Sequence, residues 1–216
     1  MKKAEVIIFD LDGTLFNTRP GIVKAIKKTI ETEGLSRLEE NEFDRFIGPP
    51  INQTFSKVFN LSEEEGKRLA DIFRQYYHDP EYLLDTREYP GIRETLKELK
   101  NRGIKTALAT YKKEKMAEEI CAHFGYDALL DVIHGSDREG KLTKQDIIKL
   151  CLKDCGVSDP GNAVMIGDSI FDAKGAESAG TMFAGVTYGF GFNNPEDILK
   201  FPGAGVINRA EEILEL

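Results

Sequence analysis

Short apolar runs that end in polar residues mark the strands expected in this chain. The first run is Val-Ile-Ile-Phe at residues 6–9, and Asp10 follows it directly. An apolar run without polar interruptions, bounded by a glycine turn signal, is typical of a strand buried on both faces of a sheet. Similar runs predict further strands over residues 104–109, 132–133, 163–166, 182–186 and 205–207.

Helical periodicity occupies the segments between these strands. The pattern predicts helices near residues 91–101, near residues 116–124 and from residue 144 onward, with shorter or weaker helices after residue 168, near residues 195–200 and at the carboxyl terminus. Alternation of strands and helices implies a mostly parallel sheet with helices on both faces. We therefore expect an α/β fold.

The segment between the first two strands differs from the rest of the chain. Residues 18–77 show helical periodicity without a strand pattern, and a Gly-Pro-Pro sequence at residues 48–50 breaks one of the helices. We expect a core made of residues 1–15 and 87–216. An all-helical domain, residues 16–86, would then be inserted directly after the first strand.

Polar residues follow three of the predicted strands. They are Asp10, Thr110 and Asp168. Because ligands bind off the carboxyl ends of the strands in open α/β sheets, we expect these three segments to meet at one site. Asp12 lies two positions after Asp10, so the two carboxylates point the same way if the extended geometry persists. Gly13 allows the backbone to turn sharply beneath them.

Paired carboxylates are suited to acid, base and metal chemistry. Like charges raise one another's pKa, so one carboxyl group holds a proton unless a cation is present. With a divalent metal, one carboxylate can be ligand and nucleophile while its partner acts as general acid and then base. Asp10 and Asp168 would suit Mg²⁺, which prefers oxygen ligands. Asp172, one helical turn after Asp168, could support the waters of the metal or only cap the next helix.

Composition and charge narrow the classes of partner. The 216 residues carry 37 acidic and 29 basic side chains, and this net charge of −8 argues against nucleic acid. The apolar runs are far shorter than the roughly 20 residues that span a bilayer, and Asp10 interrupts the first run, so we expect no membrane segment, no signal peptide and a cytoplasmic protein. Cys121, Cys151 and Cys155 match no zinc-binding pattern and are interpreted as reduced core thiols.

Several segments of the chain carry a family resemblance. FDLDGTLFNT, residues 9–18, closely resembles the first motif of the haloacid dehalogenase superfamily in its aspartate-nucleophile phosphatase form, and Gly167–Asp172 resembles the last motif. The resemblance covers essentially the whole chain. It implies a Rossmann-like three-layer sandwich and matches the helical block with the cap that this family inserts after the first motif. Phe46–Pro50 and Tyr188–Gly191 are similar to a branch with phosphoglycolate phosphatase-like enzymes and some 5′-nucleotidases.

The resemblance also implies roles for the acidic residues. Asp10 would attack phosphorus, and Asp12 would act as the general acid and then the general base. The cofactor would be Mg²⁺. The candidate residues of its site are Asp10, Asp12, Asp168 and Asp172.

The phosphoryl group would be held by residues from two further segments. Thr110 matches the second motif, in which a hydroxyl and the following backbone N–H, here that of Tyr111, hold phosphoryl oxygens. The Tyr111 ring is larger than expected at this position and could narrow the entrance. Residues 143–148 look like the third motif, whose lysine opens a helix, so we prefer Lys144 over Lys141 as the phosphate-binding cation.

These implications describe a magnesium-dependent phosphatase. It would hydrolyse a small phosphorylated metabolite, either a phosphoglycolate-like acid or a nucleoside monophosphate, through an aspartyl-phosphate, as a monomer or a homodimer. A phosphosugar mutase of the same fold is an alternative. A phospho-receiver module uses the same acyl-phosphate, but it is much shorter and lacks a helical insertion. A silent binding protein is disfavoured because every expected polar group is present.

Overall fold

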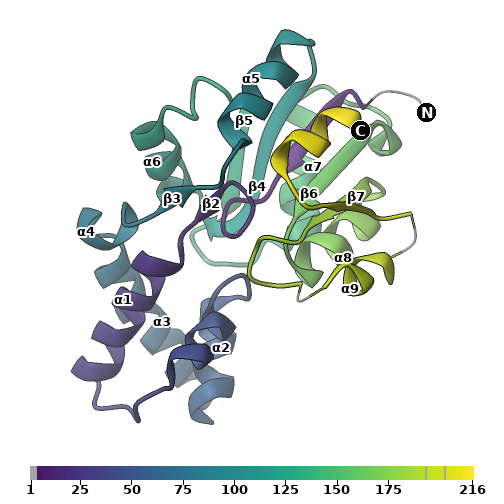
Figure 1. Ribbon diagram of the computed structural model, residues 1–216. Helices are drawn as coiled ribbons and strands as arrows, with labels where there is room; N and C mark the ends of the chain where they lie inside the picture. The colour runs from purple at the N-terminus through teal and green to yellow at the C-terminus, as the bar shows by residue number, and fades with distance from the viewer. Residues whose placement is uncertain (1–3, 193, 202) are drawn as a thin grey trace. The chain divides into compact units, whose positions relative to one another are not determined.

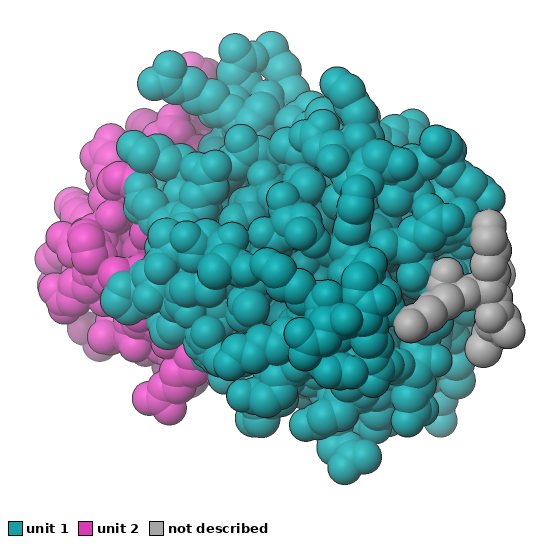
Figure 2. Space-filling model, turned by 90° about the horizontal axis from the view of Figure 1, so that it is seen from above, with its two compact units in different colours: residues 1–16, 88–216 teal, residues 17–87 magenta. Residues whose placement is uncertain are grey.

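Two compact units make up the chain. The computed structural model describes residues 4–192, 194–201 and 203–216. The first unit joins Met1–Phe16 to Glu88–Leu216, and the second is Asn17–Arg87; Figure 2 draws them in teal and magenta. Over the described residues, no helix combines the length and the apolar character needed to cross a membrane.

A parallel sheet forms the centre of the first unit (Figure 1). Its strands are β1 (Val6–Phe9), β4 (Lys105–Lys113), β5 (Val132–Ser136), β6 (Ala163–Gly167), β7 (Met182–Val186) and β8 (Gly205–Ile207). Over the described residues these six strands lie in the order β5-β4-β1-β6-β7-β8, and every neighbouring pair is parallel. The sheet confirms the predicted α/β fold.

The strand order explains why the polar residues converge. From β1 the sheet extends through β4 and β5 on one side and through β6, β7 and β8 on the other, so the order reverses between β1 and β6. Ligands of open α/β sheets bind at such a reversal, outside the carboxyl ends of the strands. Asp10 and Asp168 directly follow the two strands that meet there.

Helices cover both faces of the sheet. α7 (Lys144–Asp154) and α8 (Ile170–Ala179) share one hydrophobic cluster with Val6 and Ile8 of β1. In Figure 1, α5 (Ile92–Asn101) and the 3-10 helix η3 (Ala210–Glu215) lie in front of the sheet, and α7 lies behind it. The remaining helices of this unit are α6 (Glu114–Phe124), η2 (Pro160–Asn162) and α9 (Pro195–Leu199).

The uniform apolar run of β1 follows from its position. Val6 and Ile8 point into the cluster with α7 and α8, and because side chains alternate along a strand, Ile7 and Phe9 point to the opposite face. All four side chains are fully buried. A central strand that is covered on both faces therefore has no polar side, as the sequence predicted.

The second unit is built from helices. They are α1 (Arg19–Thr32), the 3-10 helix η1 (Glu40–Phe46), α2 (Ile51–Phe59), α3 (Glu63–Tyr77) and α4 (Pro80–Leu83). Two short strands, β2 (Phe16–Asn17) and β3 (Arg87–Glu88), pair with each other where the chain enters and leaves this unit. The sequence did not predict this pairing, since two residues are too few to show a strand pattern.

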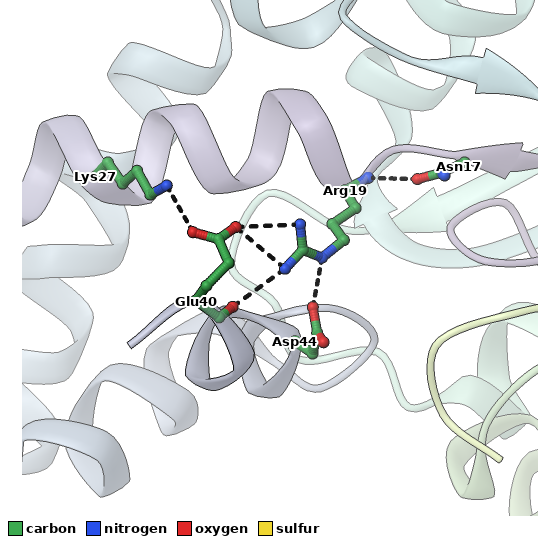
Figure 3. Close-up of polar contacts among 5 residues, drawn as sticks. All are labelled: Asn17, Arg19, Lys27, Glu40 and Asp44. Atoms are coloured by element: carbon green, nitrogen blue, oxygen red, sulfur yellow. Dashed lines mark hydrogen bonds and ion pairs between the residues drawn. The ribbon is translucent and has the colours of Figure 1, made fainter. Parts of the chain in front are cut away.

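Ion pairs hold η1 against α1 (Figure 3). The Arg19 guanidinium donates to Asp44 Oδ1 at 2.5 Å and to the backbone carbonyl of Glu40 at 3.1 Å, and Lys27 Nζ donates to Glu40 Oε2 at 2.9 Å. Exposed ion pairs contribute little individually. Here several of them converge on one short 3-10 helix.

Candidate active site

Asp10 lies at the carboxyl end of β1. Its backbone N–H donates to the carbonyl of Ile166 in β6 at 2.9 Å, which fixes the chain just after the strand. The side chain is 9% exposed. Because a buried carboxylate is costly unless it is paired, its neighbours define the site.

Lys144 supplies a cation in contact with Asp10. α7 begins at Lys144 because Thr143 and Asp146 form a reciprocal capping box: the Asp146 N–H donates to Thr143 Oγ1 at 3.2 Å, and the Thr143 N–H donates to the Asp146 carboxylate at 2.9 Å. Lys144 Nζ lies 2.6 Å from Asp10 Oδ1 and 2.6 Å from Asp172 Oδ1. The start of α7 thus places one buried ammonium between two buried carboxylates.

The alternative lysine, Lys141, lies elsewhere. Its side chain is 77% exposed and pairs with Glu139. Its backbone N–H donates to Asp137 Oδ1 at 2.7 Å. The structure therefore brings Lys144, and not Lys141, to Asp10.

Asp168 and Asp172 come from the end of β6 and the first turn of α8. Asp172 Oδ2 accepts hydrogen bonds from the Ser169 backbone N–H at 3.0 Å and the Ser169 hydroxyl at 2.6 Å. Asp172 therefore caps the helix, and its other oxygen, Oδ1, faces Lys144. The helix cap that the sequence offered for Asp172 is thus present, and the second oxygen of the same carboxylate pairs with Lys144.

Three of the aspartates form a group that could hold a metal ion. Asp10, Asp168 and Asp172 each offer a carboxylate oxygen, and these atoms lie within 4.8 Å of one another. Asp172 Oδ1 is buried and faces the Lys144 ammonium at 2.6 Å. A buried group of carboxylate oxygens that outnumber their one contacting ammonium fits a hard divalent cation.

The ionisation of the group reflects its excess of negative charge. Burial raises the pKa of Asp10 to about 7, and the carboxylates of Asp172 and Asp12 add to this rise while the Lys144 ammonium opposes it. Burial also raises the pKa of Asp168 well above its usual range. For Lys144, the two contacting carboxylates outweigh the effect of burial and raise the pKa. A divalent cation would oppose both carboxyl shifts, since it favours the charged forms.

Asp12 lies outside the three-aspartate group. Its Oδ1 is 3.0 Å from Lys112 Nζ, and the side chains of the two residues are 12% and 6% exposed. The Asp12 side chain, which we also expect at the metal, is thus paired with the Lys112 ammonium. Lys112 was missed from the sequence, although it lies two residues after Thr110, where an extended strand returns side chains to the same face.

Thr110 and Tyr111 lie in the last part of β4, where its pairing with β5 shifts in register between Ala109 and Lys113. Thr110 is buried, and its hydroxyl accepts a hydrogen bond from the Lys112 backbone N–H at 3.1 Å. The Tyr111 hydroxyl accepts from the Lys144 backbone N–H at 3.0 Å, and its ring packs edge-on against Phe171. The large side chain at residue 111 therefore connects β4 to the first residue of α7.

A loop near the carboxyl terminus also contributes to the site. The backbone N–H groups of Phe190 and Gly191 donate to Asp168 Oδ2 at 2.6 and 3.1 Å. In the sequence, Tyr188–Gly191 was noted only for its similarity to one branch of the family, and no role was assigned to it. Its glycines were the available signal, because a glycine-rich loop allows a backbone to approach another group closely.

The fold and this group of side chains define an α/β enzyme with its polar site at the carboxyl ends of parallel strands. The chain matches the family model described as haloacid dehalogenase-like hydrolase over residues 7–186. It belongs to that family, whose members are generally metal-dependent.

Relatives of this chain are phosphatases by name. It is 33% identical to a 5′-nucleotidase of Pseudomonas aeruginosa over 186 residues, which cover 86% of this chain and 83% of the relative. It is 28% identical to a phosphoglycolate phosphatase of Aquifex aeolicus, with 90% and 95% covered. A crystal structure of a predicted phosphatase from Clostridium acetobutylicum superposes with a TM-score of 0.91 at 30% identity, covering all of both chains.

These similarities confirm two predictions. The chain is a haloacid dehalogenase-like hydrolase, and it is an enzyme of the phosphatase type. The prediction of an enzyme is thereby confirmed over a phospho-receiver or a binding protein.

Proposed function

We propose that the chain hydrolyses a small phosphomonoester with Mg²⁺ through an aspartyl-phosphate on Asp10. The observation that carries the proposal is the contact of Asp10 with Lys144 beside Asp168 and Asp172, at the carboxyl end of the central strand. A nucleophile, a cation for the phosphoryl charge and a group of metal-type ligands thus occur together in one buried place.

The reaction proceeds in two displacements. The Asp10 carboxylate attacks phosphorus, the ester P–O bond breaks, and the leaving oxygen takes the proton of Asp12. A water molecule then loses a proton to Asp12 and attacks the acyl-phosphate, which releases inorganic phosphate and restores both carboxyl groups. Lys144 and Thr110, with the Tyr111 N–H, hold the phosphoryl oxygens, because catalysis of phosphoryl transfer is mostly positioning and charge stabilisation.

Asp10, Asp168 and Asp172 are the residues that would hold Mg²⁺, the last directly or through water. The bound ion would supply positive charge against the repulsion between Asp10 and a phosphate dianion. The charge excess at these residues supports a divalent ion, since Lys144 alone cannot neutralise three aspartates.

We also propose a division of labour between the two units. The core holds the phosphoryl group, and the helical unit acts as a cap that selects the leaving group, either a phosphoglycolate-like acid or a nucleoside monophosphate. Two facts support this proposal. The helical unit is inserted directly after the acidic pair, and the relatives named above carry these two substrate names.

Chemical trapping tests the reaction. Full-length protein is mixed with Mg²⁺ and phosphoglycolate or a nucleoside monophosphate, quenched with acid and reduced with borohydride, which converts an aspartyl-phosphate to homoserine. We expect homoserine at residue 10 in the wild type. With p-nitrophenyl phosphate, whose leaving group needs no proton, we expect more of it in Asp12→Asn, which lacks the base for the second step. Asp10→Asn is the control without product. Turnover without homoserine at residue 10 in either protein would overturn the proposal.

A further inference from the structure

Asp168 is enclosed by backbone from two distant parts of the chain. Gly13 follows the acidic pair near the amino terminus, and Gly189 and Gly191 belong to the loop after β7. The loop makes three hydrogen bonds to this one residue: Phe190 and Gly191 donate to Asp168 Oδ2, and the Phe192 N–H donates to the Asp168 carbonyl at 2.8 Å.

Only glycine permits this enclosure. A Cβ atom at Gly189 would lie 2.2 Å from Asp168 Cβ and 2.6 Å from its Oδ2, and a Cβ atom at Gly13 would lie 2.2 Å from the same oxygen. These separations are far below van der Waals contact. Gly13 also has φ +83°, a backbone conformation that side chains with a Cβ rarely adopt. The backbone thus replaces side chains as the wall around one carboxylate.

The two carboxylate oxygens of Asp168 have different surroundings. Oδ2 receives two N–H donors and is covered by Gly13 and Gly189, so its lone pairs are occupied by the protein. No described residue donates a hydrogen bond to Asp168 Oδ1. Hydrogen-bond donors that contact a metal ligand on the side away from the ion fix the orientation of the ligand and raise the affinity of the site for the metal.

We propose that the loop Tyr188–Gly191 is a positioning element that presents Asp168 to the divalent ion through a single oxygen, Oδ1. The inference rests on the proposed function in one respect, namely that Asp168 is a ligand of that ion. It adds that the loop, about twenty residues further along the chain, sets the affinity for the ion without touching it.

Direct metal binding tests the proposal. Isothermal titration of the full-length protein with MgCl₂, and with MnCl₂ as a second probe, is compared for the wild type, Gly189→Ala and the control Gly205→Ala. Gly205 lies in β8, where an added Cβ meets Ala184 at an ordinary 3.4 Å. We expect Gly189→Ala to bind the ion about 10- to 100-fold more weakly and Gly205→Ala to bind as the wild type does.

Two outcomes contradict the proposal in distinguishable ways. If the wild type binds and Gly189→Ala binds equally well, the loop has no positioning role, while the proposed function stands. If the wild type binds neither ion, both this inference and the magnesium dependence are wrong.

Hydrogen exchange provides a second test that does not require Gly189→Ala to fold. The amides of Phe190 and Gly191 are followed in the metal-free wild type, in Asp168→Ala and in the control Asp172→Ala. Removal of the acceptor should speed exchange of these two amides at least tenfold in Asp168→Ala and leave it near wild type in Asp172→Ala. Equal protection in all three proteins would show that the carboxylate does not order the loop, and would overturn the inference.

Discussion

At the scale of single residues, charge balance governs the site. Three aspartates and one lysine lie together out of water, and burial, with a smaller contribution from the neighbouring carboxylates, raises the pKa values of Asp10 and Asp168. Asp172 illustrates how closely the site is shared, since one of its oxygens caps a helix while the other faces the ammonium. A change at any of these residues should alter both stability and activity.

Replacement of each lysine by Met should distinguish the role of Lys144 from that of Lys141. Lys144→Met leaves Asp10 and Asp172 without their buried cation, and loss of one partner of a buried ion pair costs about 3–5 kcal/mol. We expect a fall of that size in the free energy of unfolding and a loss of activity of at least 100-fold. Lys141→Met, at an exposed position, should change the free energy of unfolding by less than about 0.5 kcal/mol. Urea unfolding and kcat/KM on p-nitrophenyl phosphate measure both effects, and equal losses in the two variants would contradict the assignment.

The raised pKa of Asp10 predicts a pH dependence of stability in the metal-free protein. The pKa is 3.8 for the unfolded group and about 7 in the folded protein. Between these values the folded state retains a proton that the unfolded chain has released, so stability falls as pH rises through this window. Asp10→Asn mimics the protonated group and should lack this contribution.

The measurement is urea unfolding of both proteins in chelator from pH 4 to pH 8. Relative to Asp10→Asn, the wild type should lose stability by up to about 1.4 kcal/mol per pH unit inside the window and no further above it. Saturating MgCl₂ should remove the loss, because the bound ion favours the ionised carboxylate. A constant difference between the two proteins in chelator would refute the prediction.

At the scale of elements, the residues of the site lie at the starts of helices and at the ends of strands. The capping box of α7 determines where the helix begins, and Lys144 is its first residue. Thr143→Ala removes the cap and should lower the free energy of unfolding by about 1 kcal/mol. It should also lower kcat/KM severalfold, because the backbone that carries Lys144 is no longer fixed.

Ser62→Ala is the matched control for the α7 cap. Ser62 caps α3 in the helical unit and accepts from the Glu65 N–H at 3.1 Å. Its loss should cost a similar free energy of unfolding and leave activity on p-nitrophenyl phosphate unchanged. If both variants lose stability and neither loses activity, the α7 cap serves stability alone.

Strands with a strong apolar pattern were predictable from the sequence. The polar residues by which such a strand continues past its apolar run were not. β1 was readable because burial on both faces leaves an unbroken apolar run. β4 was predicted to end at residue 109, but its pairing continues to Lys113, opposite Ser136. Hydrophobicity reports burial and not backbone pairing, so the polar end of β4 and the contact of Lys112 with Asp12 were missed.

At the scale of the whole molecule, residues that are far apart in the sequence meet at one site. Asp10, Thr110 and Asp168 were predicted to converge because the carboxyl ends of parallel strands share one edge. Lys144 was chosen from the resemblance of residues 143–148 to the third motif of the family. The loop around Asp168 could not be predicted in this way, since its role depends on an approach between Gly189 and a carboxylate 21 residues earlier in the chain. The helical unit stands apart in sequence and has its own aromatic core, in which the Phe46 and Phe55 rings lie 5.1 Å apart.

The proposed cap predicts that changes in the helical unit alter substrate preference more than chemistry. Ile51 is the first residue of α2, directly after the Gly48-Pro49-Pro50 break, and it is only partly buried. Ile51→Ala should therefore change the ratio of kcat/KM for phosphoglycolate to that for a nucleoside monophosphate by tenfold or more. The rate on p-nitrophenyl phosphate should change less than threefold, because that ester needs only the phosphoryl site. Ile72→Ala, the same truncation at a partly buried position of α3, is the control and should leave the ratio unaltered. If Ile51→Ala lowers all three rates by one common factor while the protein stays folded, the helical unit does not select the substrate.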